Sequence, residues 1–272
     1  MTEPVQTLLT AVLGLGAGLI GGLAGIGGSL IMIPGLAFLY GYHTKTGEVD
    51  PTGHDHHLFM ASAMCVNALV SFPAAVRHHK AGALHMPAAK VLTPSMALAI
   101  IAGVLVSNTV DGVWLKYLLA GFIATYCAIN IFRVFAKKRE PSVTESRATT
   151  PRLVAIGVFV GLMAGVLGIG GGLVMVPLLQ LLCKMPLRAS IGTSSGVMCI
   201  TALVGASAKL ISLSGLDLDV TRALQLAAVM GPLAMIGGWL GAKLTHTLPL
   251  DWVRAIISIL LIIAAAKLAG LL

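Results

Sequence analysis

The segment GLIGGLAGIGGSLIMIPGL at residues 18–36 decides the fold, because it recurs as GLMAGVLGIGGGLVMVPLL at residues 161–179. The two segments align without gaps at a constant offset of 143 residues, and eleven of their nineteen positions are identical. Each copy holds the glycine cluster GIGG with a proline six residues later. Apolar composition alone does not produce this match, so we predict that the chain is a duplication.

Looser matches extend the duplication toward the end of each half. AIIAGVL at 99–105 corresponds to AMIGGWL at 234–240, and WLK at 114–116 corresponds to WVR at 252–254. The predicted organisation is a first transmembrane repeat over residues 1–136, a basic cytoplasmic linker over 137–151 and a second transmembrane repeat over 152–272.

The composition is that of a membrane protein. Hydrophobic residues make up 57% of the 272 residues and charged residues only 10%, whereas a soluble domain carries about 25% charged residues. A soluble fold could not bury so much apolar surface, so we predict an all-α polytopic protein of the plasma (inner) membrane. The net charge of +8 comes from basic residues between apolar runs, which indicates membrane orientation and not a nucleic-acid partner.

Eight apolar stretches follow one another along the chain. Six have the length of one helical span, but the first and the fifth hold more than thirty residues. At about 1.5 Å per residue, such a helix is longer than a hydrocarbon core of about 30 Å. Both long stretches contain the glycine cluster near the middle, where a helix can end and restart. The stretches cover residues 5–40, 58–76, 88–108, 113–135, 153–183, 190–208, 221–242 and 252–272.

The loop charges orient the two halves. The loops at 77–90 and 133–152 are rich in lysine and arginine and are expected in the cytoplasm, with the histidine-rich loop at 41–57 on the opposite side. These assignments agree only if each long stretch is a hairpin that returns to the side it came from. Each half then makes three further crossings, which predicts two inverted-topology repeats, as in many secondary transporters. One long kinked helix per half, giving parallel repeats, is the alternative.

The broken hairpins are the predicted binding site. Unpaired backbone groups inside a bilayer are tolerated only within protein or beside a water-filled cavity, and the start of a helix attracts anions. Hydroxyl and amide side chains in the following span of each half could bind a substrate oxygen, although interhelical packing is the alternative role for each. The candidate substrate-binding residues are Gly25, Gly27, Gly28, Ser29, Ser62, Asn67, Gly168, Gly170, Gly171, Gly172, Thr193, Ser194, Ser195 and Lys209.

The positions of the acidic residues argue against a cation site. All ten fall at predicted termini or loops, whereas carriers of divalent cations use carboxylates inside the membrane. No catalytic constellation or cofactor motif is present, so we predict neither an enzyme nor a resident cofactor or metal. His54, His56 and His57, with His43 upstream, resemble a metal-binding cluster, although a solvated loop tip is the simpler interpretation. A cation or metal transporter that uses residues 43–57 therefore stays open as an alternative.

At the repeated glycine turn the chain resembles the TauE/SafE family of sulfite exporters and anion permeases. GLAGIGGSLIMIP at 22–34 and AGVLGIGGGLVMVPLL at 164–179 carry the resemblance, together with ASAM at 61–64 and ASIGTSSG at 189–196. The resemblance implies export or uptake of sulfur oxyanions or organosulfonates such as sulfite, thiosulfate or sulfoacetate, driven by a proton or ion gradient. The residues themselves indicate only a small anion.

Two features depart from the family pattern. One is the long histidine-rich loop, and the other is Ala63-Met64 after Ser62, where the second half has a Thr-Ser pair. We expect as partners the lipid bilayer, a small anionic substrate and a coupling proton or ion, and a homodimer is compatible with two such compact units. A non-transporting membrane scaffold is the remaining alternative, and it predicts that replacing Gly27 or Gly170 lowers abundance alone.

Overall fold

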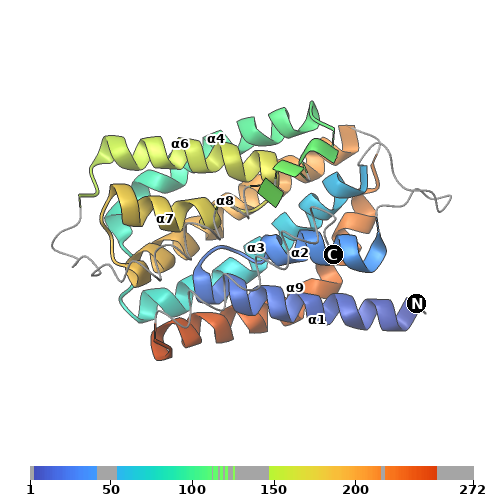
Figure 1. Ribbon diagram of the computed structural model, residues 1–272, viewed down its shortest axis with the longest axis horizontal. Coiled ribbons are helices and arrows are strands. Elements are labelled where there is room, and N and C mark those ends of the chain that lie inside the picture. The colour runs from blue at the N-terminus through green and yellow to red at the C-terminus, as the bar shows by residue number, and fades with distance from the viewer. Residues whose placement is uncertain are drawn as a thin grey trace.

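The computed structural model describes residues 3–41, 54–111, 147–215 and 218–249, with shorter pieces at 113–115, 117–118, 120–121 and 125. These residues are mainly helical, and no strand occurs among them (Figure 1). The helices are α1 (Glu3–Ala24), α2 (Ser29–Tyr40), α3 (His54–Lys80), α4 (Met86–Asn108), α6 (Thr150–Leu167), α7 (Gly172–Leu182), α8 (Leu187–Gly215) and α9 (Val220–Thr247).

Six of these helices are long and apolar enough to cross a membrane, namely α1, α3, α4, α6, α8 and α9, whereas α2 and α7 are shorter. Large apolar side chains also lie on the outside of the bundle. Leu98 is 73% exposed and Ile211 is 74% exposed, as expected where helices face lipid tails and not water. The predicted fold class, an all-α polytopic membrane protein, is confirmed.

Both long apolar stretches are interrupted at the glycine cluster, as predicted. Residues 25–28 separate α1 from α2, and residues 168–171 separate α6 from α7. Gly25 has a φ of 65° and Gly170 a φ of 67°. Glycine enters this left-handed region without the steric cost that a Cβ atom imposes, which is why the turns form where the glycines cluster.

Each interrupted pair folds back on itself. In the first pair, Gln6 Nε2 donates a hydrogen bond to Leu39 O at 2.9 Å, so the beginning of α1 meets the end of α2. In the second pair, Arg147 N donates to Cys183 O at 2.7 Å and joins the two ends in the same way. The pairs α1–α2 and α6–α7 are therefore hairpins, and the alternative of one long kinked helix per half is wrong.

The two halves interlock. α1 packs along α9 and α4 packs along α6, so each hairpin lies against the fourth helix of the other half, with α3 and α8 between these layers (Figure 1). Near the beginning of α3, His57 Nδ1 lies 2.9 Å from Lys209 Nζ. Further along α3, Ser71 O accepts a hydrogen bond from Cys199 Sγ at 3.2 Å. Because the partner numbers fall along α8 as they rise along α3, these two helices are antiparallel.

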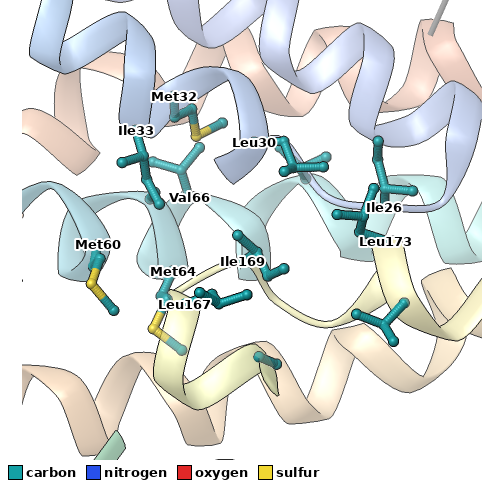
Figure 2. Close-up of a cluster of buried hydrophobic side chains, with 14 of the residues drawn as sticks. Ile26, Leu30, Met32, Ile33, Met60, Met64, Val66, Leu167, Ile169 and Leu173 are labelled. Atoms are coloured by element: carbon teal, nitrogen blue, oxygen red, sulfur yellow. The ribbon is translucent and has the colours of Figure 1, made fainter. Parts of the chain in front are cut away.

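The hydrophobic core surrounds the two glycine turns. Ile26 and Ile169, each within a turn, are fully buried, as are Leu30, Leu173 and Met64. Figure 2 shows these side chains between the turns and α3. The core therefore holds both turns in place at the centre of the bundle.

Parts of the sequence interpretation lie outside the described residues. They include the predicted span at 252–272, most of the span at 113–135, most of the linker at 137–151, and His43. The predicted loop at 41–57 needs a correction at its end. α3 already begins at His54, so the histidines that follow belong to a helix and not to a loop tip.

Candidate functional site

The two glycine turns meet in the middle of the bundle. A Cβ atom built on Gly172 would lie 2.6 Å from Ile26 Cα, so the second turn packs directly on the backbone of the first. A Cβ on Gly27 would lie 2.8 Å from Asn67 Oδ1 and 2.7 Å from Met198 Cε. We call this region, made of residues 25–29, residues 168–172, Asn67 and Met198, the glycine crossing.

Asn67 of α3 caps the helix that restarts in the first half. Its Oδ1 accepts hydrogen bonds from the backbone amides of Gly28 at 2.7 Å and Ser29 at 3.1 Å. The side chain is fully buried. Two amides that the sequence analysis assigned to a substrate are therefore already satisfied by the protein.

The other end of the same amide is left without a partner. Within the part of the chain that the structure describes, Asn67 Nδ2 is buried and makes no hydrogen bond, and the same holds for Ser29 Oγ. A Cβ on Gly170 would lie 2.7 Å from this Nδ2, so the amide group faces the second turn. A buried polar group without a hydrogen bond costs about 1–3 kcal/mol, which a ligand that accepts a hydrogen bond would recover.

The second restarting helix has no side-chain cap. The residue before α7 is Gly171, which has no side chain that could cap the helix, and among the described residues no other side chain caps it as Asn67 caps α2. Backbone N–H groups and the positive end of the helix dipole at such a terminus favour an anion. The unpartnered Asn67 Nδ2 and the uncapped start of α7 thus place hydrogen-bond donors on the same side of the crossing.

The crossing contains no carboxylate. The four acidic residues within the described ranges are Glu3, Asp55, Asp111 and Asp219. Each lies at or near a helix end and none belongs to the crossing. This set of donors without negative charge suits an anion and does not provide the ligands of a hard cation.

The predicted hydroxyl residues take different places. Ser194 Oγ donates a hydrogen bond to Gly25 O at 2.7 Å and so joins α8 to the first turn. Ser62 Oγ donates within its own helix to Leu58 O at 2.9 Å. Thr193 Oγ1 accepts from His85 N at 3.0 Å, away from the crossing.

Three further predicted residues are buried. Ser195, next to Ser194, is 3% exposed. Gly168 packs on the side chain of Met60, and Gly171 packs on that of Met96. Of the candidate residues, the crossing therefore contains the glycines, Ser29 and Asn67, and Ser194 hydrogen-bonds to it.

Lys209 does not belong to the crossing. It lies eleven residues beyond Met198 along α8, which corresponds to about 16 Å at about 1.5 Å per residue. The side chain is fully buried.

Sequence reasoning also misjudged the histidines. His56 is 1% exposed and His57 is 4% exposed, so neither forms a solvated tip. Within the described ranges, no group of three potential ligands could hold a metal ion.

Met198 is the residue of the crossing that the sequence analysis missed. A signal was present, because Met198 precedes Lys209 by eleven residues as Asn67 precedes His78. Aligning the sequence of α3 with that of α8 on these two basic residues would have shown that Met198 occupies the position of Asn67 in the other half.

Comparisons with known proteins point to membrane transporters. The family model described as "Sulfite exporter TauE/SafE" matches residues 10–268. A probable membrane transporter protein of Haemophilus influenzae is 27% identical over 273 residues, which cover 96% of this chain and 97% of that protein. One of Methanocaldococcus jannaschii is 27% identical over 199 residues, 72% of this chain and 70% of that protein.

A further relative is longer. The probable membrane transporter protein MamO of Magnetospirillum gryphiswaldense is 24% identical over 288 residues, 94% of this chain, and the chain spans 44% of its length. No solved structure matches the chain. By the family match over nearly its whole length, the chain belongs to the sulfite exporter TauE/SafE family of membrane transporters.

Proposed function

We propose that this protein is a secondary transporter, an exporter or permease, for small anions. The cargo is a sulfur oxyanion or an organosulfonate such as sulfite or sulfoacetate, bound at the glycine crossing and moved by alternating access. The observation that carries the proposal is the buried, unpartnered Asn67 Nδ2 beside the uncapped start of α7. The name of the family supports the choice of sulfur anions.

We infer that the two halves are inverted repeats. α3 and α8 hold corresponding places in the two halves, and their antiparallel packing supports opposite orientations. Inverted repeats provide two equivalent packings of the same helices, which is the usual basis of alternating access around a central site. The plasma (inner) membrane is the proposed location, with the basic linker at 137–151 in the cytoplasm.

The buried state of the crossing fits one stage of such a cycle. Ser29, Asn67 and Ser194 are all fully buried, so the described conformation is closed to water at the site. Transport requires that the hairpins separate from α3 or α8 on one side at a time.

The experiment is uptake into proteoliposomes that contain the purified protein. Radiolabelled sulfite, thiosulfate and sulfoacetate are compared with rubidium and zinc ions, and protein-free vesicles give the background. Saturable uptake of at least one of the three anions is expected, with no uptake of the cations. Uptake of the cations alone, or no protein-dependent uptake of any of the anions, would overturn the proposal.

A further inference from the structure

The helices α3 and α8 hold equivalent places beside the two glycine turns. Gly25 of the first turn packs on Ile191 of α8, and Gly168 of the second turn packs on Met60 of α3. The two glycines correspond through the duplication, so Ile191 and Met60 correspond as well, at a spacing of 131 residues. Each turn therefore rests on the same place of the span that belongs to the other half.

Met198 is the counterpart of Asn67, because the same 131 residues separate the two. The ends of both side chains lie between the turns. A Cβ atom on Gly27 would lie 2.8 Å from Asn67 Oδ1 and 2.7 Å from Met198 Cε. A Cβ atom on Gly170 would lie 2.7 Å from Asn67 Nδ2 and 3.0 Å from Met198 Cε. The two side chains thus meet both turns, and the structure keeps the symmetry that the sequence spacing indicates.

Asn67 caps a helix, but Met198 cannot. Asn67 Oδ1 accepts hydrogen bonds from the two amides at the start of α2. The corresponding amides at the start of α7 are those of Gly171 and Gly172. The Met198 thioether lies beside this second pair, because a Cβ atom on Gly172 would lie 2.7 Å from Met198 Sδ. A thioether sulfur is only a weak acceptor, so among the described residues no side chain does for α7 what Asn67 does for α2.

The backbone of the two turns differs at the residue before each restarting helix. Gly28, before the capped α2, has a φ of −87°, whereas Gly171, before the uncapped α7, has a φ of 84°. Glycine adopts both conformations without the steric cost of a Cβ atom. The second turn can therefore take the conformation of the first when a cap arrives.

A buried donor faces the same place. Among the described residues, Asn67 Nδ2 has no hydrogen-bond partner, and it faces Gly170, which directly precedes the uncapped amides. These donors lack an acceptor, and the end of the Met198 side chain lies beside them. Methionine is unbranched and has three rotatable side-chain bonds, so this side chain can withdraw without movement of α8.

We propose that the cargo anion binds as the missing cap of α7, and that Met198 is the specificity-determining residue because it leaves this cap vacant. One oxygen of the anion accepts from the amides of Gly171 and Gly172, and a second oxygen accepts from Asn67 Nδ2. The Met198 side chain fills this place in the closed, empty state and withdraws when the anion binds. This inference rests on the proposed function, because it assigns the contacts of the same cargo.

Met198→Asn should close the site from within. The introduced carboxamide mirrors that of Asn67, so its oxygen can accept from the α7 amides, and the two carboxamides can exchange hydrogen bonds with each other. Such a cap stabilises a helix, whereas a polar side chain without partners destabilises a core. The variant should therefore melt at or above the temperature of the wild type and lose the anion site.

Two measurements on the purified full-length protein test this inference. One is the melting temperature in detergent. The other is the initial rate of uptake into proteoliposomes, over a range of concentrations, of the anion among sulfite, thiosulfate and sulfoacetate that the wild type carries fastest. Met230→Asn is the matched control, because Met230 is fully buried on α9 and does not belong to the crossing.

Met198→Asn should keep or raise the melting temperature and raise the apparent KM by about tenfold to a hundredfold, the effect of losing hydrogen bonds to a charged ligand. Met230→Asn should melt at a lower temperature than the wild type, with an unchanged apparent KM. The two variants thus carry the same substitution with opposite effects on stability and on binding.

A Met198→Asn variant that melts below the wild type, or does not fold, would overturn the proposal, because Met198 would then be ordinary core packing. A stable variant with an unchanged apparent KM would overturn it as well, because the cargo would then bind elsewhere. Failure of the wild type to take up any of the three anions would instead remove the proposed function, and this inference with it.

Discussion

Replacing Asn67 by aspartate separates the two roles of this side chain. The substitution keeps the Oδ1 acceptor, which bonds the Gly28 and Ser29 amides at 2.7 and 3.1 Å. It converts the unpartnered Nδ2 donor into a second carboxylate oxygen. Aspartate and asparagine cap helix starts equally well, and the two backbone amides favour the ionised form. The variant should therefore keep the cap on α2, while the second, unpartnered carboxylate oxygen in this buried place lowers the melting temperature.

Anion binding should be lost in this variant. A carboxylate about 4 Å from a bound anion repels it by about 4 kcal/mol at an effective dielectric constant of about 20. The lost hydrogen bond to a charged ligand contributes about 1.5–3 kcal/mol more. Since about 1.4 kcal/mol corresponds to a factor of ten, the repulsion alone raises the apparent KM about a thousandfold.

Initial rates of sulfite uptake into proteoliposomes over a range of concentrations measure this effect. Asn67→Leu is the matched control, because it removes both the acceptor and the donor and so lowers the melting temperature together with uptake. If the folded aspartate variant takes up sulfite with an unchanged apparent KM, the reasoning is refuted.

Three other substitutions test the crossing and its supports. Gly170→Ala places a methyl group 2.7 Å from the Asn67 amide at a φ of 67°, and a left-handed alanine costs about 1–2 kcal/mol. The melting temperature and the rate of uptake should therefore both fall. The control Gly16→Ala, which has open space around it, should lower neither. Thr193→Val removes the acceptor of the His85 amide and should lower the melting temperature by the equivalent of about 1–3 kcal/mol; reduced uptake at unchanged stability would instead indicate contact with the cargo. Ser194→Ala removes the bond to the first turn at 2.7 Å and should destabilise the fold by about 1 kcal/mol, measured by thermal unfolding; an unchanged unfolding temperature would show that this bond contributes nothing.

The hairpins could be predicted from the sequence because their cause is local. A stretch longer than the membrane must break, and the break falls where glycine permits a left-handed turn, at residues 25–28 and 168–171. The duplication then predicts that both halves do the same. Length and backbone sterics, which act over a few residues, were sufficient for this part of the fold.

The partners of the turns could not be predicted, because they depend on contacts between distant segments. Nothing near Asn67 in the sequence indicates that it caps a helix 38 and 39 residues earlier in the chain. The glycines of α1 illustrate the same limit. Gly14 and Gly22 allow α1 to approach α9 closely at Met230 and Gly238, and spacing alone shows that a helix has a small-residue face but not which helix covers it.

The burial of Lys209 could not be predicted for a related reason. A lysine near the end of an apolar span is usually drawn to the membrane surface. Lys209 instead meets Ser107 and Asn108 from the end of α4 and His57 from the beginning of α3. Three neutral acceptors from two other helices can hold such a group inside the bundle, and only the tertiary structure brings them together.

The most direct test of the binding site is diffraction from crystals grown with selenite, the selenium counterpart of sulfite, because selenium can be located by anomalous scattering. The account predicts a selenium peak at the glycine crossing, with ligand oxygens within hydrogen-bond distance of Asn67 Nδ2 and the first backbone amides of α7. A fully occupied peak elsewhere, with the crossing closed and empty, would contradict it.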